Sequence, residues 1–268
     1  MKKRLGRLKL KRILEIIPGA FSWSILSFLI LLFIFWPLVA AVVMIVFLLY
    51  WVARFLYMSI LLFLSHHRVS TKKNIDWLAK CRGVRSDLKF QDILHIVLYT
   101  VYKEPDQVLQ ESLRALKEST YPLDRVIVVL AGEERADKSS ERLSKLKEQF
   151  GASFKDILVT IHPKDVAGEI PAKGANATYA AKEVRSYLRQ KAVALDGVVL
   201  SCFDADTCPD KNYLACLTYN FLNSPNRHRT SFQPLPVYSN NIYTAPAFAR
   251  VIEMGSTFWQ LVESMKYE

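Results

Sequence analysis

The sequence predicts an α/β protein in which a two-helix transmembrane hairpin precedes a mostly parallel sheet flanked by helices. Residues 20–64 hold a single charged side chain, Arg54, which indicates the membrane segment. Residues 93–264 alternate between apolar, β-branched runs and amphipathic helical patterns, which indicates the sheet. The composition is 51% hydrophobic and 23% charged, which excludes a disordered chain.

The apolar stretch is long enough for two membrane spans. At ~1.5 Å per residue, one continuous helix over it would be about 68 Å long, roughly twice a bilayer core of ~30 Å. Pro37 follows Trp36 where a break is needed, because proline lacks an N–H and clashes inside a helix. We expect a first span over residues 21–35 and a second over residues 39–64.

The net charge of +11 indicates membrane orientation, not a nucleic-acid partner. The excess flanks the apolar stretch, because residues 1–19 carry +6 and residues 66–89 carry +5. Basic flanks stay on the cytoplasmic side, so we expect a multi-pass protein of the inner (cytoplasmic) membrane with its soluble domain in the cytoplasm. Arg54 either snorkels toward the cytoplasmic headgroups or pairs within the membrane.

The soluble part is expected to contain five strands with helices between them. Residues 93–102 form the apolar, β-branched run that is typical of a buried parallel strand. Pro105 and Asp106 then mark the start of a helix that ends near Tyr121. The other expected strands cover residues 125–130, 156–161, 197–203 and 230–237, and the other expected helices cover residues 138–150, 173–191, 213–222 and 247–264.

Two aspartates follow the fourth expected strand directly. Side chains two apart in an extended segment point to the same side, so the carboxylates of Asp204 and Asp206 should converge. Converging carboxylates repel unless a cation lies beside them, and oxygen ligands favour Mg²⁺ or Mn²⁺ with substrate phosphates completing the shell. Alternatively, residues 204–207 form a turn in which an aspartate caps the next helix.

Two other segments lie where ligands bind in such sheets, at the carboxyl ends of the strands. Residues 173–176, Lys-Gly-Ala-Asn, open a helix, and a helix start, a glycine and a lysine all favour bound phosphate. Thr100 and Glu104 follow the first strand and could hold a nucleoside, although Glu104 could equally be a surface residue of the first helical turn.

The order and spacing of these motifs resemble glycosyltransferase family 2, the inverting nucleotide-sugar-dependent enzymes with the GT-A fold. More narrowly, the sequence resembles the bacterial membrane-associated members with an N-terminal hairpin. The resemblance covers residues 93–264. It is carried by Tyr-Thr-Val-Tyr-Lys-Glu at 99–104, Val-Val-Leu-Ala-Gly-Glu-Glu at 128–134, Pro-Ala-Lys-Gly-Ala-Asn at 171–176, Phe-Asp-Ala-Asp-Thr at 203–207 and Ser-Phe-Gln-Pro-Leu-Pro at 231–236.

The resemblance implies a donor-binding role for each matching residue. Thr100 and Glu104 would line the nucleoside pocket, and Lys173 would face the diphosphate. The family usually carries an aspartate for the base after the second strand, and Glu133 is the candidate that stands there.

The resemblance also implies a metal site. Asp204 would meet the ribose or the metal, and Asp206 would bind Mg²⁺ or Mn²⁺. The metal would neutralise the charge that develops on the departing nucleoside diphosphate.

The predicted function is that of a membrane-anchored inverting glycosyltransferase, which transfers a sugar from a nucleotide-sugar donor to a cell-envelope or lipid-linked acceptor. The expected organisation is a basic cytoplasmic segment (1–19), a transmembrane hairpin (20–65), a basic linker (66–92) and a GT-A-like nucleotide-sugar-binding domain (93–268).

The catalytic base is not identified in this chain. Family members place an acidic residue farther on, often in a Glu-Asp pair, whereas the acids after Asp210 are isolated: Glu253, Glu263 and Glu268. We therefore expect the chain to be the front portion of a longer protein.

Two other functions remain open. A non-catalytic nucleotide-sugar-binding or scaffold protein with the same fold would also lack the base. A nucleotidyl transferase would be expected to carry a Gly/Arg-rich phosphate loop after its first strand, and residues 103–106 do not form one.

Overall fold

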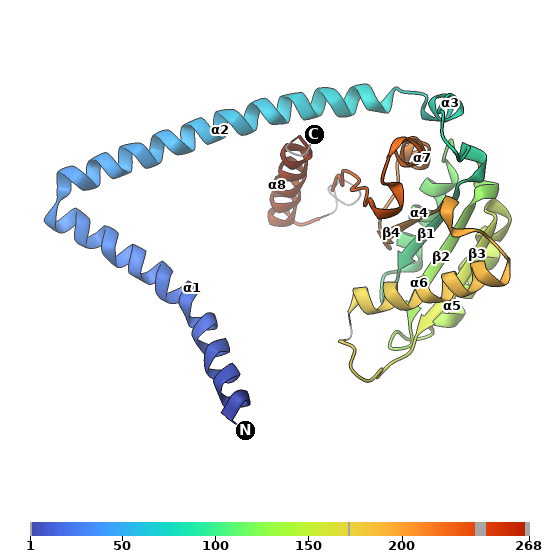
Figure 1. The fold of residues 1–268 in the computed structure, drawn as a ribbon, viewed down its shortest axis with the longest axis horizontal. Helices are drawn as coiled ribbons and strands as arrows, with labels where there is room; N and C mark the ends of the chain where they lie inside the picture. Colours follow the sequence, from blue (N-terminus) through green and yellow to red (C-terminus); the bar gives the residue numbers. More distant parts are fainter. Residues whose placement is uncertain (1, 171, 239–244, 266–268) are drawn as a thin grey trace. The chain divides into compact units, whose positions relative to one another are not determined.

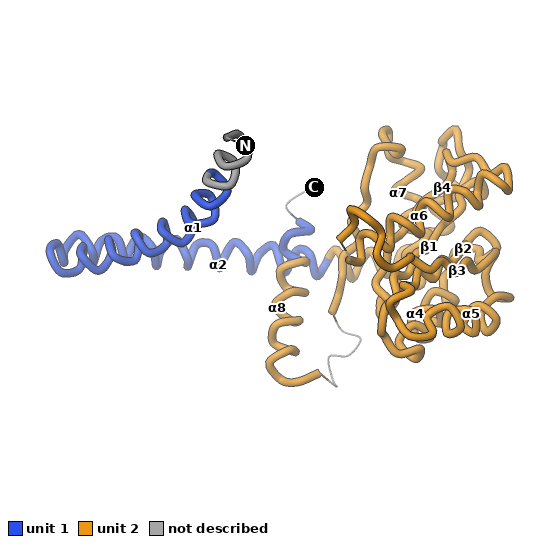
Figure 2. The backbone as a smooth tube through the Cα atoms, turned by 90° about the horizontal axis from the view of Figure 1, so that it is seen from below, with its two compact units in different colours: residues 1–67, 261–268 blue, residues 68–260 orange. Residues whose placement is uncertain are grey.

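The computed structural model describes residues 2–170, 172–238 and 245–265 of the 268-residue chain. The chain divides into two compact units, one of Met1–His67 with Leu261–Glu268 and the other of Arg68–Gln260 (Figure 2). The helices are α1 (Lys2–Phe35), α2 (Pro37–Lys73), α3 (Trp77–Arg82), α4 (Asp106–Lys117), α5 (Ser139–Phe150), α6 (Lys173–Gln190), α7 (Tyr213–Asn223) and α8 (Ala247–Ser264), and the strands are β1 (Leu94–Thr100), β2 (Val126–Glu133), β3 (Asp156–His162) and β4 (Val198–Asp204).

The four strands form one parallel sheet in the order β3-β2-β1-β4 (Figure 1). Each consecutive pair of strands is joined by a crossover that contains a helix, which is the connection that parallel pairing requires. The predicted α/β class, a mostly parallel sheet flanked by helices, is confirmed. Because all strands run the same way, their carboxyl ends meet at one edge of the sheet.

Helices cover both faces of this sheet. Alternate residues of the central strand point to opposite faces, so Val97 and Tyr99 pack with α4, α5 and α7, whereas Ile96 and Leu98 pack with α6. Figure 2 shows α6 on one side of the strands and α4 and α5 on the other. All seven residues of β1 are buried, which explains why that run is mostly apolar.

Four of the five expected strands are present, with their ends shifted by at most three residues. The expected strand over residues 230–237 is wrong, because residues 230–238 form no strand. Pro234 and Pro236 lack the N–H groups that a ladder needs. Phe232 packs instead against a small apolar cluster that includes Val199 and Phe221.

The expected helix break lies at Trp36, between α1 and α2. Leu10–Phe35 and Pro37–Lys73 are each long and apolar enough to cross a membrane, and 0% and 6% of their most apolar windows are buried. The helices continue beyond the predicted spans into the basic flanks. Their apolar surfaces are therefore not covered by the protein core, as a membrane segment requires.

Candidate functional site

A cavity of about 510 Å³ lies at the carboxyl edge of the sheet, a usual size for a small-molecule site. The ends of β1, β2 and β4 and the first turn of α6 form its walls. All six residues that the sequence singled out line it: Thr100, Glu104, Glu133, Lys173, Asp204 and Asp206. The structure thus brings the candidates together, while their binding roles remain predictions.

The two aspartates are held by contacts to neighbouring elements. Thr100 pairs with Asp204 in the β1–β4 register, and its hydroxyl donates to the Phe203 carbonyl over 3.2 Å. The Ser112 hydroxyl of α4 donates to the Ala205 carbonyl over 2.7 Å, and both residues are buried. These contacts fix the backbone on which both carboxylates stand.

The alternative interpretation of this segment is correct in part. The Thr207 N–H donates to the Asp204 carbonyl over 3.0 Å, which closes a turn. However, α7 begins only at Tyr213, and Asn212 is its N-cap residue. Neither Asp204 nor Asp206 therefore caps that helix, and both carboxylates stay at the cavity.

Lys173 stands at the first position of α6 and forms an ion pair with Asp204. Both side chains are more than half exposed, so solvent screens this pair and a ligand can reach either member. The N-cap residue, Ala172, has no side chain that can satisfy the first N–H groups of the helix. The positive end of α6 therefore opens toward the cavity beside Lys173.

Glu133 is the last residue of β2 and is 5% exposed. Its carboxylate accepts two hydrogen bonds from the Arg135 guanidinium, one of them over 2.9 Å from Nε. This guanidinium lies 5.3 Å from the ring centroid of Tyr102, another lining residue. The result is a buried carboxylate, a cation and an aromatic ring on one wall of the cavity.

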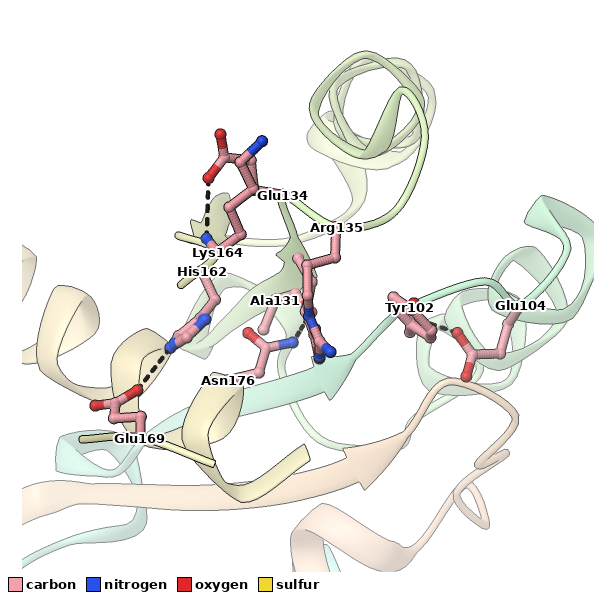
Figure 3. A network of polar contacts seen from close by, with 10 residues as sticks. Tyr102, Glu104, Ala131, Glu134, Arg135, His162, Lys164, Glu169 and Asn176 are labelled. Atoms are coloured by element: carbon pink, nitrogen blue, oxygen red, sulfur yellow. Dashed lines mark hydrogen bonds and ion pairs between the residues drawn. The ribbon is translucent and has the colours of Figure 1, made fainter. Parts of the chain in front are cut away.

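Glu104 lines the cavity but also has a structural role. Its carboxylate accepts a hydrogen bond from the Tyr102 N–H over 2.6 Å, which closes the loop after β1 (Figure 3). Its carbonyl accepts a bond from Arg142 of α5 over 2.6 Å. Both interpretations of Glu104 therefore apply in part, because it orders the loop and faces the cavity.

Three lining residues with polar side chains were missed by the sequence analysis: Tyr102, Arg135 and Asn176. Tyr102 and Asn176 lie inside segments that carry the resemblance, so those motifs could have indicated them. Asn176 is 2% exposed and its amide Nδ2 donates to the Ala131 carbonyl over 2.8 Å, which ties α6 to β2 (Figure 3). Arg135 lies beyond the end of β2, and no sequence signal marks it.

A smaller cavity of about 200 Å³ adjoins the first and shares Glu133, Arg135 and Ala172 with it. Its outer wall is the loop after β3. His162 Nε2 and Glu169 Oε2 are 3.0 Å apart, and this contact joins the start of the loop to its far side (Figure 3). Gly168 has a φ of +84°, which favours glycine.

The chemistry of the donor set suits only certain metals. Within the described residues, no group of three or more His, Cys, Asp or Glu side chains could hold a metal ion. The cavity offers the oxygens of Asp204 and Asp206, which are hard ligands. These fit a cation such as Mg²⁺ or Mn²⁺ that takes its remaining ligands from water and substrate phosphates.

No protein-family model matches the sequence, and no curated protein matches it. Among solved structures, the chain is similar to a mannosyltransferase from Pyrobaculum calidifontis, solved in complex with GDP-Man and Mn²⁺. The TM-score is 0.34 and the identity is 15%, over 63% of this chain and 45% of that one. The chain thus spans less than half of that protein. At this level the likeness carries no argument about function.

Proposed function

We propose that this protein is a membrane-anchored glycosyltransferase that takes its sugar from a nucleotide-sugar donor. The observation that carries the proposal is the cavity at the carboxyl edge, where the two aspartates at and after the end of β4, the lysine of α6 and the buried glutamate of β2 meet. The resemblance to family 2 assigns donor binding to these positions.

The cavity presents a different chemistry to each part of such a donor. The α6 N-terminus and Lys173 attract the diphosphate, because both carry positive charge. Thr100 lines the cavity opposite Asp204 in the strand register, where the ribose would lie. Glu133, with Arg135 and Tyr102, offers an acceptor, a donor and an aromatic face to a nucleobase.

Asp204 and Asp206 would hold Mg²⁺ or Mn²⁺ against the diphosphate. When bound, the metal supplies Lewis-acid stabilisation of the leaving nucleoside diphosphate. The chain's own residues bind the donor and hold its phosphates next to Lys173, whose ammonium also offsets charge on the leaving group. Deprotonation of the acceptor hydroxyl is assigned to no described residue.

The proposal places this cavity on the cytoplasmic side of the membrane. The apolar windows of α1 and α2 are almost entirely exposed, and basic residues flank both helices, which supports a hairpin with both ends inside. A cell-envelope or lipid-linked acceptor would suit an enzyme that is held at the bilayer.

Calorimetry on the full chain in nanodiscs tests donor binding. UDP and GDP are titrated with and without Mn²⁺ into the wild type, Asp206→Ala and the control Asp137→Ala. Asp137 is an exposed aspartate that does not line the cavity. We expect Mn²⁺-dependent binding that Asp206→Ala weakens roughly tenfold or more, since contacts to charged groups contribute about 1.5–3 kcal/mol.

Absence of binding for both nucleotides, or equal affinity in Asp206→Ala and the wild type, would refute the proposed donor site. Orientation is measured separately by maleimide labelling of Cys202 and Cys208, which are exposed, whereas Cys81 is buried. The label should reach the exposed cysteines in inside-out vesicles and fail to reach them in intact cells. Labelling from outside the cell would contradict the cytoplasmic assignment.

A further inference from the structure

Helix α8 carries an apolar face that the described residues leave largely uncovered. At about 100° per residue, its large apolar side chains fall on one half of the helix, and Glu253, Ser256, Gln260 and Ser264 fall on the other. The exposed large apolar side chains of α8 are Phe248, Val251, Ile252, Met254 and Trp259.

The end of α8 is attached to α2, just after the apolar stretch expected to form the second span. The hydroxyls of Ser65 and Ser264 are 3.3 Å apart, and these residues belong to the same compact unit. Ser65 is 1% exposed and Val262 is 0% exposed, so this junction is packed. Ser65 directly follows the expected second span, and His66, His67 and Arg68 come next in the sequence.

This attachment sets the level of α8 relative to the bilayer. If α2 spans the membrane, Ser65 lies where the hydrocarbon ends and the basic residues begin, which is the headgroup region. The C-terminal turn of α8 must lie at that level too. An amphipathic helix that starts from this level can turn its apolar face to the acyl boundary and its polar face to water.

The composition of α8 fits that position and not a third span. Arg250, Glu253 and Glu263 interrupt its 18 residues, and α8 is not among the described helices that are apolar enough to cross a membrane. Trp259 lies on the apolar face, and indole rings are enriched at the headgroup level. Arg250 borders this face, where its stem can cover apolar surface while its guanidinium meets lipid phosphate.

We propose that α8 is an interfacial helix that lies in the cytoplasmic headgroup layer, with lipid as the occupant of its apolar face. The inference rests on the proposed membrane anchoring, because the level of Ser65 is defined only if α2 spans the bilayer. It adds a second membrane contact, located more than 170 residues after the end of α2, that would hold the soluble domain close to the lipid surface.

Photolabelling with a diazirine-bearing phospholipid tests this placement on the full wild-type chain. The protein is reconstituted in nanodiscs of phosphatidylcholine and phosphatidylglycerol, and the labelled residues are mapped by mass spectrometry. We expect label in α1, in α2 and on the apolar face of α8, and none at Ser256 or Gln260.

Two variants provide the matched comparison. Ile252→Glu places a charge on the apolar face, and Ser256→Glu places the same charge on the polar face. We expect Ile252→Glu to reduce labelling of α8 by roughly tenfold, because burial of one large aliphatic side chain is lost. Ser256→Glu should leave the labelling unchanged, and circular dichroism checks that both variants fold.

The outcomes separate this inference from the proposed function. If α1 and α2 are labelled and α8 is not, the interfacial placement of α8 is wrong while the membrane anchoring stands. Such a result would show that protein covers the apolar face of α8. Equal labelling of both faces of α8, or equal loss in both variants, also overturns this placement. If α1 and α2 stay unlabelled, both the membrane anchoring and the interfacial placement of α8 are wrong. The proposed nucleotide binding is tested separately by calorimetry.

Discussion

The amide of Asn176 allows a sharp test of how α6 is held at the cavity. Its Nδ2 donates to the Ala131 carbonyl over 2.8 Å, and the same carbonyl accepts the Val101 N–H over 2.8 Å. A carbonyl only accepts, so the atom that faces it must be the nitrogen. The Oδ1 atom is buried and has no hydrogen-bond partner among the described residues.

Asn176→Asp changes the chemistry of the side chain and keeps its shape. The donor becomes a carboxylate oxygen that faces a carbonyl oxygen, and the charge is buried at a site that is 2% exposed. We expect the free energy of unfolding to fall by about 3–5 kcal/mol, the usual effect of an uncompensated buried charge. Acid should reduce this loss, because a protonated carboxyl can again donate to Ala131.

Asn176→Ala should be much milder, although it removes more atoms. It deletes one hydrogen bond that contributes about 1 kcal/mol, and it also removes the buried, unpartnered Oδ1, whose burial costs about 1–3 kcal/mol. The two effects oppose each other. We therefore expect a net change within about 1 kcal/mol, apart from the small space that the amide leaves.

Pulse proteolysis of the detergent-solubilised protein in urea measures the free energies of unfolding. Asn220→Asp is the matched control, because the exposed Asn220 amide also donates to a backbone carbonyl, that of Cys216, over 2.8 Å. Water solvates the new charge there, so this variant should lose less than about 1 kcal/mol. If Asn176→Asp costs no more than Asn220→Asp or Asn176→Ala, the assigned amide orientation is wrong.

Three further predictions concern the scaffold around the cavity. Burial lowers the pKa of His95 from 6.5 to about 3, so only the unfolded chain binds that proton between these values. As the pH is lowered from 6.5 toward 3, the stability of the wild type should therefore decrease by about 1.4 kcal/mol per pH unit more than that of His95→Asn, measured by urea unfolding at several pH values. Gly132→Ala would place a Cβ 2.6 Å from Leu143 Cδ1. We therefore expect the free energy of unfolding to fall by about 1–3 kcal/mol in the same assay. An unchanged stability would contradict the close packing of β2 and α5. Ser112→Ala removes the hydrogen-bond donor to the buried Ala205 carbonyl. It should lower the free energy of unfolding by about 1–3 kcal/mol and weaken nucleotide binding in calorimetry. An unchanged affinity would show that this hydrogen bond does not position the aspartates.

The hydrophobic pattern of the sequence predicted the strands whose carboxyl ends form the cavity, but it did not predict every contact at that edge. β1 and β2 are buried on both faces, so their sequences are apolar runs that need no knowledge of the rest of the chain. Residues 230–237 also read as a strand, yet strand formation requires a pairing partner, and two prolines remove donors from that run. The hydrophobic pattern of a single segment does not show whether another strand is available to pair with it.

The side chains of the site also differ in whether the local sequence could predict their contacts. Thr100 and Asp204 could be predicted to meet, because both follow strands and the carboxyl ends of parallel strands share an edge. Arg135 could not, since its contact with Glu133 and Tyr102 depends on the path of the chain after β2. A loop residue carries no periodicity that would reveal its direction.

If the cavity binds a nucleotide-sugar donor and a metal as proposed, its charges predict that the two bind cooperatively. In the structure, Lys173 is paired with Asp204 and Arg135 with Glu133. A diphosphate that takes over the Lys173 ammonium leaves the Asp204 carboxylate without that partner, next to a second carboxylate at Asp206 and new phosphate charge. A divalent cation relieves this repulsion, and without the diphosphate it must instead compete with Lys173 for Asp204. Each ligand should therefore raise the affinity of the other, and linkage requires both affinities to rise by the same factor.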